Sequence, residues 1–206
     1  MARPVVDGHS IVINGAWNIR IFSPEWVAAN LAPETDVGLA VAVGNPTAPI
    51  RLQFRGIYLR VGAERLVFSP VHLSDQALTT MQDVARTVVT MLPHTPMSAV
   101  GINFQYLVED PPVQLLDVFR FSDNGPLAEF GAEIESAMIR RSTRFREAAL
   151  NLVLALRADA AATIEFNNHS EITGGAEALT AINRPILELR DTAIDGLRSL
   201  YGLEVH

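Results

Sequence analysis

The residues of this chain whose types and spacing suggest chemistry are arginines on strand-like segments. Arg51, Arg55, Arg60 and Arg65 alternate with apolar residues along three short stretches, and Arg20 lies on an earlier one. Because neighbouring side chains of a strand point to opposite faces, these arginines are predicted to share one face wherever their strands adjoin. Guanidinium groups pair with carboxylates or phosphates in a bidentate way, so such a face would bind an acidic protein segment or an anion. The alternative is a solvated face that pairs with some of the 23 acidic residues.

A second polar surface follows from the alternation of three further strand-like segments. Its members are mostly amides, namely Asn103, Gln105, Asn151, Thr163, Glu165 and Asn167. Two interpretations stay open. The face is either exposed to solvent or a contact surface for a partner protein or a second copy of the chain.

Motifs of the common enzyme classes are absent from the sequence. It contains no G-x-S-x-G elbow, no H-E-x-x-H pair, no phosphate loop ending in Lys and no dinucleotide fingerprint. The five histidines stand apart without ligand spacing, and no cysteine is present. We therefore expect no catalytic residue, no cofactor and no metal. An enzyme would need a site assembled only in the fold, with His169 or His72 beside a carboxylate of perturbed pKa.

Two charged clusters near the middle of the chain have plainer interpretations. Glu133 and Glu135 fall on one face of a predicted strand over 132–143 and are expected to form a wet edge. Arg140, Arg141, Arg144 and Arg146 alternate around the end of the same strand, so they do not converge. A solvated edge that discourages stray strand pairing accounts for them.

Composition limits the partners and the compartment. The net charge is -7, and an acidic chain does not carry the diffuse positive field of a general nucleic-acid binder. No window has the length and apolar character of a membrane span, and residues 1–14 do not resemble a secretory leader. The lack of cysteine fits a reducing compartment, so we expect a cytoplasmic protein.

The apolar periodicity predicts strands and helices in a mixed order. In the last third, strands over 149–156 and 162–167 precede one long helix over 175–202, which Pro185 is expected to kink near Ile182. A hairpin over 9–22, turning at Asn14-Gly15, is expected at the start of the chain. Helices are further predicted over 24–31, 75–92 and 113–121, and strands over 37–43, 50–55, 57–61, 65–68, 97–108 and 132–143.

This order of elements favours a single α+β domain over residues 1–206. Its sheet is predicted to be mainly antiparallel and covered by two long helices. An alternative keeps the same elements but divides them into two related lobes, 1–110 and 111–206, each with its own covering helix.

Two short motifs suggest a family. The ending L-R-S-L-Y-G at 197–202 resembles the L-R-x-L-[FY]-G terminus of a sporadically distributed, uncharacterised family of bacterial proteins. The stretch V-G-I-N-F-Q-Y at 100–106 is similar to the mid-chain strand of that family, and the order of elements from Ser74 onward agrees with it. The resemblance implies a bacterial protein and implies no catalytic residues.

Three functions are compatible with the sequence. The first is a noncatalytic interaction or assembly component that uses polar sheet faces or edges to bind itself or another protein. The second is a small-ligand or anion-binding regulator in which the arginines converge on one pocket. The third is an enzyme whose site is visible only in the fold.

Overall fold

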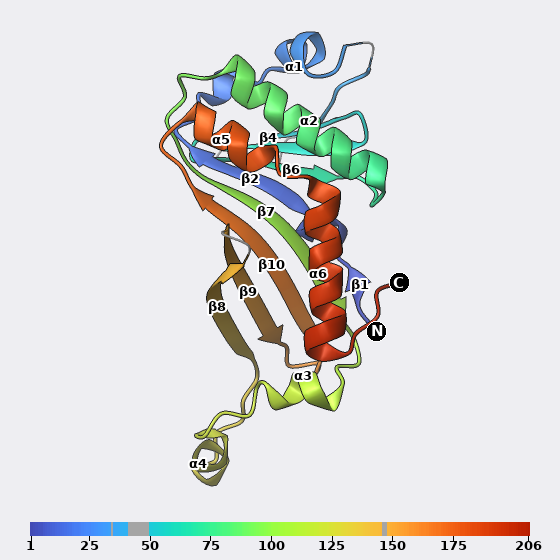
Figure 1. Ribbon diagram of the computed structural model, residues 1–206, viewed down its shortest axis with the longest axis vertical. Helices are drawn as coiled ribbons and strands as arrows, with labels where there is room; N and C mark the ends of the chain where they lie inside the picture. The colour runs from blue at the N-terminus through green and yellow to red at the C-terminus, as the bar shows by residue number, and fades with distance from the viewer. Residues whose placement is uncertain (34, 41–49, 146–147) are drawn as a thin grey trace.

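The computed structural model describes residues 1–33, 35–40, 50–145 and 148–206, and ten strands among them form one sheet (Figure 1). The strand order is β3-β4-β5-β6-β2-β7-β10-β9-β8, with β1 pairing with β7, and every pair of strands is antiparallel. The α+β class with an antiparallel sheet is therefore confirmed. The strands are β1 (Arg3–Pro4), β2 (Ser10–Gly15), β3 (Gly38–Ala40), β4 (Ile50–Phe54), β5 (Ile57–Val61), β6 (Arg65–Pro70), β7 (Met97–Val108), β8 (Ala137–Phe145), β9 (Ala148–Leu156) and β10 (Ala162–Glu171).

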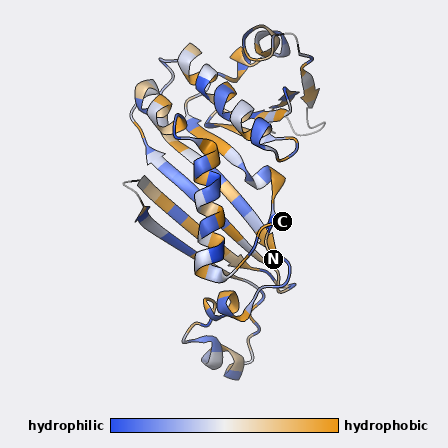
Figure 2. Cartoon of the chain, turned by 45° about the vertical axis from the view of Figure 1, so that its right-hand side comes forward, coloured by the Kyte–Doolittle hydropathy of each residue, from blue (hydrophilic) through white to orange (hydrophobic). Residues whose placement is uncertain are grey.

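The longest strand, β7, lies near the middle of the sheet and spans the residues predicted for it. Its alternating side chains Val100, Ile102 and Phe104 are almost fully buried on one face. β2 pairs along one edge of β7 and β10 along the other, with Phe104 opposite Phe166. Figure 2 shows hydrophilic and hydrophobic bands alternating along the strands, as expected of a sheet with one buried face.

Helices α2, α5 and α6 lie on the same face of the sheet (Figure 1), which we call the helix face. The opposite face is called the open face. α2 begins where the hydroxyl of Ser74 accepts a hydrogen bond from the backbone N–H of Ala77, and it buries one apolar side on the sheet. The helices are α1 (Pro24–Asn30), α2 (Asp75–Met91), α3 (Val113–Asp117), α4 (Asn124–Glu129), α5 (Gly175–Ile182) and α6 (Ile186–Tyr201), with single 3₁₀ turns η1 (Val6–Gly8) and η2 (Ile19–Ile21).

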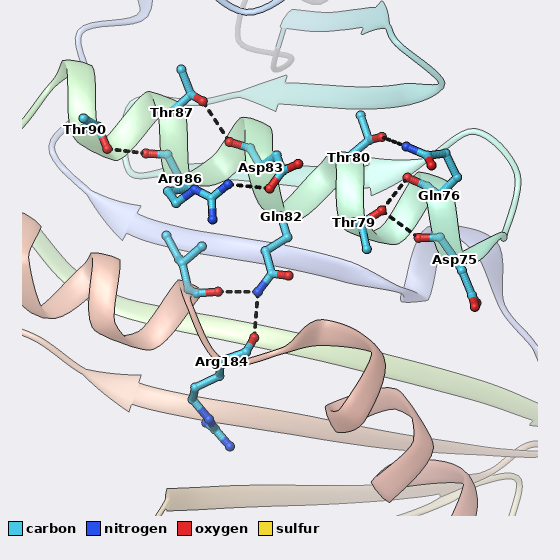
Figure 3. Close-up of polar contacts among 11 residues, drawn as sticks. Asp75, Gln76, Thr79, Thr80, Gln82, Asp83, Arg86, Thr87, Thr90 and Arg184 are labelled. Atoms are coloured by element: carbon cyan, nitrogen blue, oxygen red, sulfur yellow. Dashed lines mark hydrogen bonds and ion pairs between the residues drawn. The ribbon is translucent and has the colours of Figure 1, made fainter.

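The predicted single helix over 175–202 is wrong, because the chain forms α5 and α6 with a break between them. Pro185 lacks a backbone N–H and lies at the N-cap of α6 with an extended ψ of 112°. The amide Nε2 of Gln82 on α2 donates to the carbonyls of Ile182 (2.5 Å) and Arg184 (2.6 Å), which the break leaves free (Figure 3). The break is therefore held by α2, and the prediction of two long covering helices is not confirmed.

The predicted hairpin at Asn14-Gly15 is also wrong. Residues 17–22 contain the 3₁₀ turn η2, and β2 pairs with β6 and β7. The register of β2 against β7 shifts between Asn14 and Gly15, so Gly15 belongs to a bulge. The indole N–H of Trp17 donates to the carbonyl of Ile13 (3.2 Å), and the ring is buried. In place of the second strand of the predicted hairpin, the chain places Trp17 in the core and continues into η2.

Three other boundaries differ from prediction. The strand expected over 132–143 begins only at Ala137, so Glu133 and Glu135 precede it and do not share a strand face. The helix expected over 113–121 ends at Asp117. The strand expected over 37–43 is present as β3, and its residues 41–43 lie outside the described part of the chain.

The sheet continues through both predicted halves of the chain, so a division into two lobes is not confirmed. The two ends of the chain also meet: the N–H of Ala2 donates to the carbonyl of Glu204 (2.8 Å), and that of His206 donates to the carbonyl of Ala2 (3.2 Å). Among the described residues, none of the helices is both long and apolar enough to cross a bilayer.

The bulge at Gly15 gives a test of the core. A Cβ at this position would lie 2.6 Å from the carbonyl oxygen of Pro96, which is backbone and cannot turn away. We expect Gly15→Ala to lower the free energy of unfolding by about 1–3 kcal/mol, measured by urea denaturation. The matched variant Gly125→Ala, in α4 with no atom within 4 Å of the added Cβ, should show no loss. Equal stability of both variants would contradict the close approach.

Candidate functional site

The structure places three of the five predicted arginines on one face, and two of the three are direct neighbours. Arg51 on β4 and Arg60 on β5 are cross-strand neighbours on the open face, and Arg65 at the start of β6 lies on the same face. Arg55 lies in the β4–β5 turn with φ of 49°, and its Nη1 donates to the carbonyl of Leu31 (3.2 Å). Arg20 lies in η2, away from the sheet pairing. The predicted array is therefore reduced to Arg51, Arg60 and Arg65.

The pair Arg51 and Arg60 is held without a counter-charge. The guanidinium of Arg51 lies 3.6 Å from the centroid of the Tyr58 ring, a cation–π contact. The Nε atoms of both arginines are buried and have no hydrogen-bond partner among the described residues. Neither arginine forms an ion pair with a carboxylate in that part of the chain. Two adjacent guanidiniums with unused donors can accept an anion.

The second polar surface predicted from the sequence lies on the open face. Three of its amides, Asn103, Asn151 and Asn167, form one hydrogen-bonded row across five strands together with Ser142 and Ser10. Ser142 donates to Asn151 Oδ1 (2.7 Å), and Asn151 Nδ2 donates to Asn167 Oδ1 (3.2 Å). Asn167 Nδ2 donates in turn to Asn103 Oδ1, and Asn103 Nδ2 to the hydroxyl of Ser10 (3.1 Å). We call this row, from β8 through β9, β10 and β7 to β2, the amide ladder. Each amide uses a donor and an acceptor in bonds to its neighbours in the row. We therefore assign the row to holding the strand register and not to binding a partner.

The histidines do not form a catalytic or metal centre in the described part of the chain. His169 lies on the open face opposite Gly101 and Ala149, and His72 is an exposed loop residue. Neither makes an ion pair with a described carboxylate. No group of three or more metal-ligating side chains gathers among these residues.

The buried histidine, His9, lies in a small cavity that the sequence did not predict. The cavity, of about 250 Å³, lies between β7, α2 and α6, and it also contains Tyr106 and Arg190. His9 Nδ1 donates to the carbonyl of Val5 (2.9 Å). Burial lowers the pKa of His9 and the charge of Arg190 lowers it further, whereas the hydrogen bond to Val5 raises it by less. Burial raises the pKa of Tyr106, whose hydroxyl has no partner among the described residues. The cavity therefore presents a neutral imidazole and a neutral phenol, while Arg190 already pairs with Asp75 and Asp191.

A groove lies on the helix face between α6 and strands β8, β9 and β10. Its volume is about 600 Å³, and its lining is mainly apolar, with Leu150, Leu152, Phe166 and Leu200 among the side chains and Arg141 at the β8 side. Strands lie about 4.8 Å apart and a helix is about 10 Å wide, so one helix covers about two strands. α6 rests on β10, where Gly196 approaches the ring of Phe166 so closely that a Cβ would lie 2.9 Å from it. β9 and β8 therefore extend beyond the cover of α6.

Strand β8 is the last strand of the sheet and is exposed along most of its length. One row of its backbone groups faces away from β9, and no other described strand pairs with it. Arg140, Arg141 and Arg144 are exposed and form no ion pair with a carboxylate of the described residues. Burial raises the pKa of Glu165, two strands away on the open face, and the charge of Arg140 partly offsets that rise. β8 is thus a positively charged open edge on an acidic chain.

Sequence reasoning had identified the β8 arginines but assigned them to a solvated edge, and it missed the groove beside them. Alternation along β8 could show which face each arginine occupies. It could not show that β8 ends the sheet or that α6 stops short of it, because both depend on long-range pairing. For the cavity, the alternation along 97–108 puts Tyr106 on the same face as Ile102 and Phe104, but no signal in the sequence places Arg190 near it.

No protein-family model matches the chain, and no curated protein is significantly similar to it. The resemblance to the uncharacterised bacterial family therefore stays a prediction.

The amide ladder predicts an asymmetric effect of truncating its members. Asn167→Ala removes two hydrogen bonds from the middle of the row, so we expect the free energy of unfolding to fall by about 1–2 kcal/mol. Ser142→Ala removes one hydrogen bond at the exposed end and should cost less than about 0.5 kcal/mol. Urea denaturation of both variants measures the difference. Equal losses would show that the row does not act as a connected unit.

Proposed function

We propose that this chain is a noncatalytic binding protein whose strand β8 docks an extended, acidic segment of a protein as an additional strand. The observation that carries the proposal is the open β8 edge with three exposed arginines that form no ion pair with a carboxylate of the described residues. Backbone hydrogen bonds give affinity in strand addition, and alternate side chains give specificity. Here the arginines favour carboxylates.

The two faces of β8 would contact different side chains of the docked segment. Arg140 and Arg144 lie on the open face with Ser142, whereas Arg141 and Thr143 lie on the helix face and line the groove. A segment beside β8 therefore meets arginines on one side and the mainly apolar groove on the other. We place such a protein in the bacterial cytoplasm, since a cysteine-free chain suits a reducing compartment and the family resemblance is to bacterial proteins.

A synthetic peptide tests this docking. A fluorescent ten-residue peptide of alternating Glu and Val should bind the full chain saturably by anisotropy, and binding should weaken as salt is added. Arg140→Glu with Arg144→Glu should weaken binding roughly tenfold or more, because it reverses two charges that face the docked strand. The matched control, Arg86→Glu with Arg120→Glu, changes the net charge by the same amount in α2 and in the loop after α3.

Two results would contradict the proposal. One is equal binding of a Lys–Val peptide, which would remove the role of the arginines. The other is an equal loss of affinity in the control variant, which would show that the loss depends on net charge and not on the position of the arginines.

A second candidate function is anion binding at Arg51 and Arg60, favoured by their buried Nε donors without partners. An anion that binds the folded chain raises its melting temperature with concentration. We expect phosphate or citrate to raise the melting temperature of the native chain and to have a much smaller effect on Arg60→Ala. Arg65→Ala, on the same face but outside the cross-strand pair, is the control. An unchanged response in Arg60→Ala would exclude this site.

A further inference from the structure

We infer that the acidic segment comes from a second copy of this chain, so that two β8 strands pair antiparallel about a two-fold axis at Met138. This inference rests on the proposed function, in which β8 docks an extended segment. It identifies the occupant and the register. The two sheets would join into one, with the helices of both copies on the same face.

The first observation is the segment that directly precedes β8. Residues 132–136 have no regular secondary structure and are exposed. They contain Glu133, Ile134 and Glu135, an acid–apolar–acid alternation, and Ile134 is 46% exposed. Neither glutamate forms an ion pair with a described arginine or histidine. The chain therefore carries an exposed acidic segment without regular secondary structure next to its own arginine-rich edge strand, and the inference has this segment extend the strand on pairing.

The second observation is the register that an antiparallel pair of identical strands allows. A two-fold axis perpendicular to the sheet keeps each face continuous, so opposed residues must lie on the same face. An axis at Met138 places Glu135 of each copy opposite Arg141 of the other, on the helix face. On the open face it places Ser136 opposite Arg140. Oppositely charged cross-strand pairs stabilise a sheet, and here the symmetry forms the pair twice.

Other registers bring like charges together, lose the glutamate–arginine pair or leave more of β8 unpaired. An axis at Ile139, for example, sets Glu135 opposite Thr143 and Glu133 opposite Phe145, so neither glutamate faces an arginine. An axis at Arg140 or at Arg141 sets that arginine against its own copy, and an axis at Ser142 sets Arg140 against Arg144 twice. Like charges directly opposite one another destabilise a sheet. An axis at Ala137 pairs Glu133 with Arg141 but leaves more of β8 unpaired.

The third observation is the exposure of Met138. This side chain is 66% exposed on the open face, although it is apolar and lies on a strand. At the axis it would pack against Met138 of the second copy, where it is removed from water. An open edge strand is a ready template for pairing with another chain, and cross-strand contact between two apolar side chains stabilises such a pair.

Because the chain has no cysteine, single substitutions can locate the axis by disulfide formation. Met138→Cys in the full chain should form a disulfide-linked dimer under mild oxidation, since opposed Cβ atoms of an antiparallel pair lie about 5 Å apart. Ser142→Cys lies on the same face but about 27 Å from its own copy in this register, at about 3.4 Å per residue, and should form no disulfide-linked dimer. Faster cross-linking of Ala137→Cys or Ser142→Cys would overturn the register.

A charge exchange tests the ion pairs without any new covalent bond. Glu135→Arg and Arg141→Glu should each weaken the dimer at least about tenfold in sedimentation equilibrium, and the double variant should restore it. Glu133→Arg is the matched control and should leave the dimer unchanged. A double variant that dimerises no better than either single variant would overturn the Glu135–Arg141 pair.

The outcomes separate this inference from the proposed function. In the first outcome, the native chain is monomeric at about 100 µM, a concentration high enough to populate a weak interface, but still binds the Glu–Val peptide through Arg140 and Arg144. This result would contradict the dimer and support the docking of an acidic segment on β8. A native chain that neither dimerises nor binds the peptide overturns both. Dimers that the peptide dissociates support both.

Discussion

One face of the sheet must be removed from water, and the helices of this chain can cover only part of it. The apolar positions of β7 and its neighbours are buried beneath α2, α5 and α6, and the rest of the structure is arranged around that contact. The hydrophobic contribution grows with the apolar area that is buried, so the middle of the sheet is the stable region. Where α6 ends its cover at β10, the groove begins and β9 and β8 project beyond it. The width of the sheet relative to its helices thus accounts for both the core and the candidate site.

The open face meets a different requirement, since its polar groups need partners. In the amide ladder, side chains from five strands hydrogen-bond to one another in one row. Each donates to the next, in the direction from β8 to β2. The Nε donors of the arginine pair on β4 and β5 lack such a partner among the described residues, and the β8 arginines form no ion pair with a carboxylate there. We interpret polar side chains with partners inside the protein as structural, and those with unused hydrogen-bond donors as candidate binding sites. This distinction separates the two polar surfaces that looked equivalent in sequence.

Sequence alternation predicted the strands well where both faces were informative, as along β7 and along β4 to β6, because side-chain parity is a local property. It failed where a tertiary contact overrode a local signal: Trp17 enters the core and replaces a predicted strand, and Gln82 holds the helix break at Pro185. For the site, parity placed Arg51 and Arg60 on one face correctly. It could not reveal that Arg55 turns toward Leu31 or that β8 is an edge, because both depend on residues distant in sequence.

The contact between the two ends of the chain has a topological consequence. Because Ala2 bonds to both Glu204 and His206, a short peptide could join the ends without disturbing either β1 or α6. A circular permutant joined there and opened near Gly125, where an added Cβ meets no atom within 4 Å, would keep every strand pair of the sheet. In that permutant β8, β9 and β10 would come first and β7 near the end. The native sheet would then form by a different order of chain closures, which makes this fold suitable for asking whether its folding nucleus follows the order of the chain or the pairing of the strands.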